Sequence, residues 1–166
     1  MDGRLTVTAP TGGEGAARIT IRRMIPSDAS AAHALLEESL EAAQWAMASI
    51  AESAQSGVGW VAESGNCAAG LLIGRAAADE FEILNMAVAR AYRGQGLGSR
   101  LLREALDWAI ESGARHAHLE VRASNRAAVR LYQRSGFRQT GCRENYYSGP
   151  IEDALVLSLN LKGDSS

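Results

Sequence analysis

One stretch of the chain is rich in both glycine and arginine and runs directly into an apolar helical pattern: VARAYRGQGLGSRLLREAL. A helix N-terminus leaves several backbone N–H groups without partners and carries the positive end of the helix dipole, so it binds anions. Gly94, Gly96 and Gly98 remove the side chains that would keep a phosphate away from those groups. Arg93 and Arg100 add positive charge at the rim. The stretch therefore predicts a cradle for a pyrophosphate.

Two other glycine-rich turns that bind phosphate differ from this one. The segment RGQGLG lacks the Gly-Lys-Ser/Thr ending of a nucleotide P-loop. A dinucleotide-binding turn needs an acidic residue at the end of the following strand to hold a ribose, but Glu111 falls within the helix itself. Both nucleotide interpretations are therefore disfavoured.

The charges are spread unevenly along the chain. The net charge of −2 argues against a general nucleic-acid-binding protein. Residues 1–89 hold five arginines against eleven acids, whereas residues 90–143 hold eleven arginines against four acids. This excess of positive charge around the glycine-rich stretch suits either a solvated, arginine-rich helix face or a pocket for a polyanionic ligand.

The spacing of apolar residues predicts the elements that position this stretch. We expect strands at residues 18–24, 59–64, 67–75, 80–88, 116–121 and 152–161. We expect one helix that begins at 26–28 and a second around Trp45 to Ile50. Two more helices are expected at 97–113 and 125–136. Strands in succession, followed by alternating helices and strands, indicate a mixed α/β sheet with a parallel pairing around the glycine-rich stretch.

Length and composition indicate one domain. A chain of 166 residues with 46% apolar residues is long enough for a single packed core. We expect a flexible N-terminal arm at 1–16, the domain at 17–162 and a tail at 163–166. Because no apolar run would span a bilayer and the first residues lack a secretory signal, we expect a soluble cytoplasmic protein that does not bind membranes. Cys67 and Cys142 are too few for a disulfide framework and have no metal-site spacing.

Several motifs in order resemble those of one family. The spacing Arg93-x-x-Gly96-x-Gly98, preceded by NMAV and followed by LEVRASNRAAVRLYQRSGF, resembles the acetyl-CoA-binding core of the GNAT superfamily of N-acetyltransferases. The resemblance covers residues 80–161 well and earlier residues weakly. It implies a single α/β (α+β) domain of the GNAT type. Such a domain has a mixed, mostly antiparallel sheet with a splayed parallel strand pair and helices on both faces.

The resemblance also implies how acetyl-CoA is bound. The end of the strand at 80–88 would hold the pantetheine arm, a backbone N–H near Val88 would hold the thioester oxygen, and residues 94–99 would hold the pyrophosphate. Asn125 would bond the cofactor or would simply cap its helix. The implied cofactor contacts come from Met86, Ala87, Val88, Arg93, Gly94, Gln95, Gly96, Leu97, Gly98, Ser99, Asn125 and Tyr132.

The same resemblance suggests an acid and a base. Glu120 matches the base of the family, and the alternative is that it is simply an exposed glutamate of an edge strand. Glu82 is a second candidate base, acting through a water. Tyr132 matches the general acid that protonates the thiolate of CoA, or else it is a half-buried packing residue. The histidines have no metal-ligand spacing, so we expect no metal.

The acceptor is expected to be a protein N-terminus. The segments CRENYY and LYQRSGF resemble the branch of the superfamily that acetylates bacterial ribosomal proteins, which implies direct attack by an N-terminal alanine in a ternary complex. Glu41, Glu82, Tyr146 and Tyr147 would line an acidic and aromatic slot for this cationic terminus, unless they are ordinary loop and core residues. Two alternatives stay open: an acetyltransferase for lysine side chains or small amines, and a non-catalytic acyl-CoA-binding module.

Overall fold

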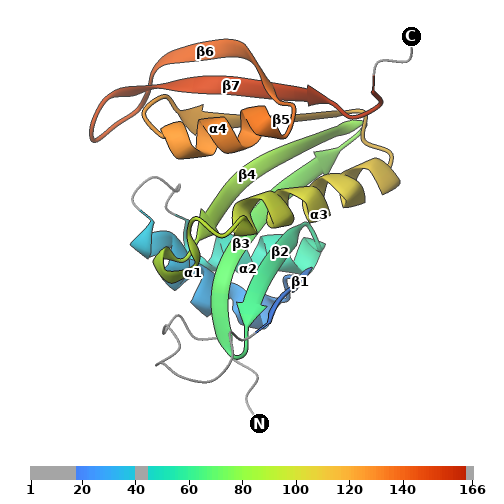
Figure 1. Ribbon diagram of the computed structural model, residues 1–166, viewed down its shortest axis with the longest axis vertical. Helices are drawn as coiled ribbons and strands as arrows, with labels where there is room; N and C mark the ends of the chain where they lie inside the picture. The colour runs from blue at the N-terminus through green and yellow to red at the C-terminus, as the bar shows by residue number, and fades with distance from the viewer. Residues whose placement is uncertain (1–17, 40–44, 164–166) are drawn as a thin grey trace. The chain divides into compact units, whose positions relative to one another are not determined.

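The computed structural model describes residues 18–39 and 45–163 (Figure 1). The helices are η1 (Pro26–Asp28), α1 (Ala29–Glu38), α2 (Met47–Ser56), η2 (Arg90–Tyr92), α3 (Leu97–Glu111) and α4 (Arg126–Arg134). The strands are β1 (Ile19–Arg23), β2 (Gly59–Ser64), β3 (Cys67–Ala77), β4 (Glu80–Val88), β5 (His116–Arg122), β6 (Arg138–Tyr147) and β7 (Glu152–Asn160). The predicted arm at 1–16 lies outside the described residues, and the predicted tail does so from residue 164.

The described strands form one sheet in the order β1-β2-β3-β4-β5-β7-β6. β4 and β5 pair in parallel, with Glu82 opposite His118, whereas the β1/β2, β2/β3, β5/β7 and β6/β7 pairs are antiparallel. Parallel neighbours need a long connection, which α3 supplies between β4 and β5. The predicted mixed sheet with a parallel pair around the glycine-rich stretch is confirmed.

The described chain divides into two compact units. The first contains residues up to 74 together with 85–105, and the second contains residues 75–84 together with those from 106 onward. In the first unit, the apolar faces of α1 and α2 supply Leu35, Leu36 and Ile50, which are all fully buried. Burial of each such side chain stabilises the fold by about 1.5–3 kcal/mol, so these faces position the helices.

The start of α1 is set by a buried aspartate. Asp28 is 1% exposed, and its Oδ2 accepts hydrogen bonds from the Ile25 backbone N–H at 2.9 Å and from Arg22 Nη1 at 2.8 Å. Because a buried carboxylate is costly unless it is paired, this arrangement ties the helix start to β1. The predicted start at 26–28 is confirmed, with η1 as its first turn.

In the second unit, β5 alternates between a core face and a polar face. Ala117, Leu119 and Val121 are buried, whereas the intervening side chains are partly exposed. Phe81 of β4 packs edge-on against Trp108 of α3, with ring centroids 5.9 Å apart. Side chains of opposite parity, among them Glu120, therefore point away from this core.

Strand β6 was not among the predicted strands. Its residues are almost all exposed, so its sequence lacks the alternation by which a half-buried strand is predicted. It lies at the edge of the sheet and pairs with β7, with register shifts between Gln139 and Gly141 and between Arg143 and Tyr147. Backbone hydrogen bonds to β7, rather than burial of its own side chains, make this segment a strand.

Candidate active site

The glycine-rich loop lies between η2 and α3 in the first unit. Gly94 and Gly96 have φ of 75° and 78°, a region that favours glycine. A Cβ added at either position would meet no heavy atom within 4 Å, so the backbone borders open space. The helix begins at Leu97, directly after the loop, which confirms the predicted strand–loop–helix order. The local conformation therefore exposes backbone N–H groups at a helix N-terminus, as an anion site requires.

Arg93 and Arg100, at the rim of the loop, also form hydrogen bonds within the chain. Arg93 Nε donates to the Val88 carbonyl at 3.0 Å, and its Nη2 lies 3.5 Å from Ser39 Oγ. Arg100 Nη2 donates to the Ile19 carbonyl at 3.1 Å. Arg93 thus ties the loop to the end of β4, in addition to carrying the charge that the sequence suggested.

The end of β4 lies very close to β3 in the first unit. A Cβ added to Gly70 would lie 3.1 Å from the Ala87 carbonyl oxygen and 3.0 Å from Leu101 Cδ1. Ala89 N–H donates to the Ala69 carbonyl at 2.8 Å. Gly70 therefore permits the close packing that places residues 86–88. Sequence reasoning missed this role, although an isolated glycine inside a strand is a signal of close backbone approach.

Glu120 projects from the polar face of β5 in the second unit. Its side chain is 23% exposed, and Arg143 Nε lies 2.7 Å from its Oε1. The Tyr146 hydroxyl lies near the same carboxylate, and its interaction with Glu120, through hydrogen bonding and charge, raises the pKa of Tyr146. Glu120 is thus a partly exposed carboxylate with two polar side chains of β6 beside it.

Glu82 lies on the same polar face as Glu120. It is opposite His118 in the parallel β4/β5 register, and Glu120 follows His118 by two residues along β5. Glu82 pairs with Arg75 and lies 3.9 Å from His118 Nε2. The structure therefore places both candidate bases on one face of the second unit.

Tyr147 is held beside Arg122. The guanidinium of Arg122 lies 4.2 Å from the centre of the Tyr147 ring and also pairs with Glu152 at 3.4 Å. The rings of Tyr146 and Tyr147 meet edge-on at 5.1 Å. Burial, with the charge of Glu120 as a second cause, raises the pKa of Tyr147. The structure thus brings Tyr146 and Tyr147 together, whereas Glu82 contacts Arg75 and His118 and Glu41 lies outside the described residues.

Tyr132 and Asn125 lie in and before α4. Tyr132 is 5% exposed and packs edge-on against Phe137 at 5.7 Å, and burial raises the pKa of its phenol. A raised pKa keeps the proton on the oxygen, as a general acid requires. Asn125 Oδ1 accepts from the Ala128 N–H at 3.2 Å, so the helix-cap interpretation is confirmed.

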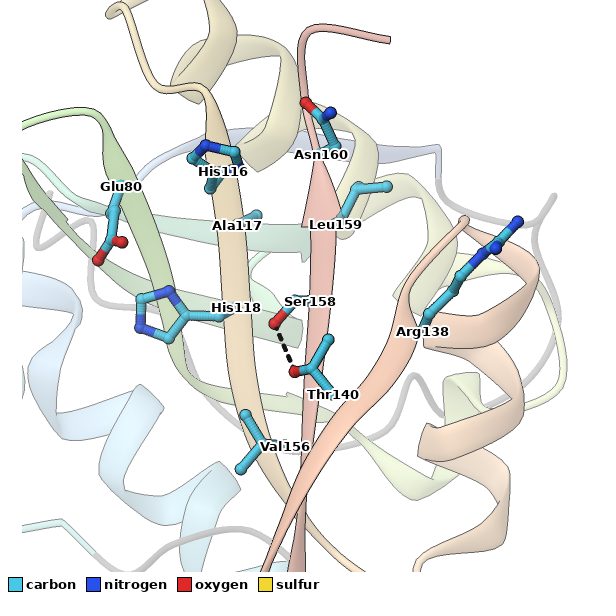
Figure 2. Close-up of a pocket in the computed structure, with 10 residues that line it drawn as sticks. All are labelled: Glu80, His116, Ala117, His118, Arg138, Thr140, Val156, Ser158, Leu159 and Asn160. Atoms are coloured by element: carbon cyan, nitrogen blue, oxygen red, sulfur yellow. Dashed lines mark hydrogen bonds between the residues drawn. The ribbon is translucent and has the colours of Figure 1, made fainter. Parts of the chain in front are cut away.

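A cavity of about 560 Å³ opens on the polar face of the second unit, where Ser158 and Thr140 share a hydrogen bond of 2.9 Å (Figure 2). It includes Val156, which pairs with Glu120 across β5 and β7. Its lining residues are Glu80, His116, Ala117, His118, Arg138, Thr140, Val156, Ser158, Leu159 and Asn160. Sequence reasoning missed this cavity because its residues come from four separate strands.

Within the described residues, no group of histidine, cysteine and acidic side chains could hold a metal ion. No helix in the same part of the chain is both long and apolar enough to cross a membrane.

Comparison with known proteins agrees with this fold and these motifs. Residues 22–137 match the model of the acetyltransferase (GNAT) family. The chain therefore belongs to the GNAT acetyltransferase family, as its motifs predicted.

Two curated relatives are similar to part of this chain. N-alpha-acetyltransferase RimI of Mycobacterium tuberculosis (strain ATCC 25618 / H37Rv) is 42% identical over 94 residues, which cover 57% of this chain and 57% of that protein. The ribosomal protein bS18-alanine N-acetyltransferase of Escherichia coli (strain K12) is 42% identical over 83 residues, or 49% of this chain and 56% of that protein. The chain thus spans little more than half the length of these curated relatives.

A solved structure matches over more of the chain. The crystal structure of the ribosomal-protein-S18-alanine N-acetyltransferase from Escherichia coli has a TM-score of 0.77 and 31% sequence identity. The match covers 87% of this chain and 94% of that chain. The similarity therefore includes the first half of the chain, where the motifs are weak.

Proposed function

We propose that this protein transfers an acetyl group from acetyl-CoA to the N-terminal α-amine of a bacterial ribosomal protein that begins with alanine. The observation that carries the proposal is Glu120, a carboxylate 23% exposed in the middle of β5, on the face opposite the core. The Escherichia coli relative supports it, since that enzyme is named for alanine acetylation of a ribosomal protein and matches 87% of this chain. The proposed place of action is the cytoplasm.

The glycine-rich loop suits a polyanionic cofactor. Gly94 and Gly96 leave open space beside their backbone, and α3 begins directly after them. Acetyl-CoA would supply the activated thioester, with its pyrophosphate held by backbone N–H groups of residues 94–99. Met86, Ala87 and Val88 would hold the pantetheine arm through their backbone, while Asn125 would add a side-chain contact.

The acid and the base have separate roles in the proposed reaction. Glu120 accepts the proton that the α-ammonium group loses, directly or through a water. The amine nitrogen would then bond to the acetyl carbon as the carbon–sulfur bond breaks, and Tyr132 would donate its proton to the sulfur. The nitrogen would lose its second proton as the amide forms, and that proton would restore the Tyr132 phenol through water. An α-amine has an ordinary pKa of about 8, so a modest base is sufficient at neutral pH. General acid–base catalysis of this kind contributes about 10²–10⁴-fold.

The acceptor N-terminus would bind beside Glu82, Tyr146 and Tyr147. The two rings meet edge-on at 5.1 Å, and interaction with Glu120 raises the pKa of Tyr146. Negative charge from Glu82 and Glu120 would suit a cationic terminus.

A peptide assay tests this function. An alanine-starting peptide of ribosomal type is compared with the same peptide that carries a blocked N-terminus and an available lysine, and products are measured by mass spectrometry. We expect acetylation of the free peptide alone. If the blocked peptide is acetylated as fast as the free one, the acceptor is a lysine side chain. If acetyl-CoA binds but no amine is acetylated, the protein is a non-catalytic binding module.

A further inference from the structure

Strand β6 places two polar side chains beside one carboxylate of β5. Arg143 Nε lies 2.7 Å from Glu120 Oε1, and interaction with Glu120 raises the pKa of Tyr146, whose hydroxyl is therefore near the same carboxylate. The sheet order places β7 between these strands, with Arg143 opposite Ala154 and Glu120 opposite Val156. Because neighbouring strands lie about 4.8 Å apart, only a long side chain on β6 reaches Glu120.

A regular strand would not direct both side chains to the same place. Arg143 and Tyr146 are three residues apart, and side chains three apart in a regular strand lie on opposite faces. The register shifts between Arg143 and Tyr147, and Asn145 between them adopts φ of 52°. Asn145 N–H is held by Asp153 Oδ1 at 2.9 Å. This bulge brings both side chains to Glu120, in agreement with the frequent use of bulges to re-aim side chains beside active sites.

The Arg143–Glu120 pair contributes little to stability. The Arg143 side chain is 59% exposed, and ion pairs that are this exposed contribute little or nothing measurable to stability. A bulge with a left-handed residue, by contrast, costs energy to maintain. The arrangement is therefore better explained by what it does to Glu120 than by what it adds to the free energy of unfolding.

We propose that Arg143 is a positioning residue for the catalytic base. This proposal rests on the proposed function, because it takes Glu120 as the group that accepts the amine proton. An ionised carboxylate has about four acceptor positions, and the guanidinium of Arg143 lies against Oε1 of Glu120. With Oε1 held in this ion pair, the carboxylate presents its remaining positions to the acceptor amine in one orientation. Arg143 thereby acts on the reaction through Glu120 and does not itself contact the amine.

A double-mutant cycle tests this role. R143Q, R143K, E120Q and the double variant E120Q/R143Q are compared with the parent for kcat and for the KM of the acceptor peptide. R134Q is the matched control, because Arg134 is an exposed arginine at the end of α4 and lines no part of the candidate site. We expect R143Q to lower kcat by about 10–100-fold, since misplacement by 1 Å can cost about 10²-fold, while acceptor KM stays within about threefold. R143K should recover most of the loss, and R134Q should match the parent.

The double variant separates a positioning role from an independent one. If Arg143 acts through Glu120, E120Q/R143Q should be no slower than E120Q, because the interaction is already lost. If the fold-losses in kcat of E120Q and R143Q multiply in the double variant, the proposal is wrong. A lower acceptor KM at unchanged kcat in R143Q, which would show that Arg143 competes with the amine for Glu120, would also overturn it. A crystal structure of R143Q in which Glu120 keeps its parent orientation would do the same.

The parent protein tests the proposed function separately. If it acetylates lysine side chains or small amines rather than N-termini, the acceptor assignment fails, and the same cycle measured with that amine still tests Arg143. If no amine is acetylated by the parent, both proposals are wrong.

Discussion

The glycine-rich loop and the polar face of β5 are built in different ways. The loop depends on backbone conformation, with Gly94 and Gly96 at positive φ beside open space. The face depends on side chains that come from β4, β5 and β6, such as Glu82, Glu120 and Arg143. A backbone site is sensitive to the addition of a side chain, whereas a side-chain site is sensitive to the loss of one functional group. Binding and chemistry should therefore fail separately in variants of the two regions.

The largest expected effect is on the chemistry of the polar face. E120Q keeps the shape of the side chain but removes its basicity, so turnover at neutral pH should fall by about 10²–10⁴-fold. Raising the pH should recover part of the loss, since more of a free α-amine with a pKa of about 8 becomes neutral. Steady-state kinetics between pH 6.5 and 9.5 (about the accessible range for this amine) measure this. Equal rates for E120Q and the parent at every pH would move the base to Glu82.

A variant of Tyr132 should lose turnover, as variants of the polar face do, rather than cofactor affinity. Y132F keeps the ring and its packing on Phe137 but lacks the proton, so we expect turnover to fall by about 10²-fold or more. Affinity for acetyl-CoA should change little. Kinetics with parallel calorimetry separate the two quantities. A variant with near-normal turnover would make Tyr132 a packing residue only.

A variant of the glycine-rich loop should instead lose affinity for acetyl-CoA. G96V places a side chain in the space beside the loop and strains a backbone with φ of 78°. The Kd for acetyl-CoA should therefore rise by about 10–100-fold, which is the effect of losing one hydrogen bond to a charged group. G113V is the matched control, since Gly113 has φ of 95° and also borders open space. Both variants should lose similar stability. An unchanged Kd in G96V, measured by calorimetry, would remove the phosphate cradle.

The smallest expected effect is on stability at alkaline pH. Burial raises the pKa of Tyr132 above its ordinary value of about 10, so the folded state holds this proton more tightly than the unfolded state. Its contribution is therefore complete below about pH 10 and is lost as the pH rises above that value. Urea unfolding at about pH 8 and about pH 11 should show a larger loss of free energy for the parent than for Y132F. Equal losses would mean that the phenol is not buried in solution.

Predictions from sequence succeeded where neighbouring residues determine the structure. Apolar spacing placed β5 and α4 closely, and of the two roles suggested for Asn125 the helix cap is confirmed. The sequence missed β6, because an exposed edge strand has no apolar alternation. It also missed the role of Gly70, whose reason lies in the Ala87 carbonyl on another strand.

The sequence by itself determined the class of this protein and the identity of its candidate groups. The loop from Arg93 to Gly98 was identified from residue types and local spacing, because a helix N-terminus and a glycine turn are local structures. The acids and tyrosines downstream were identified through the resemblance of their motifs to the GNAT family. Only the tertiary structure decided which of these side chains meet. Arg143 and Tyr146 reach Glu120 because β7 pairs with both β5 and β6 and because a bulge turns two residues of β6 to one face. Register between strands and the position of a bulge depend on contacts far apart in the chain, so no local pattern contains them.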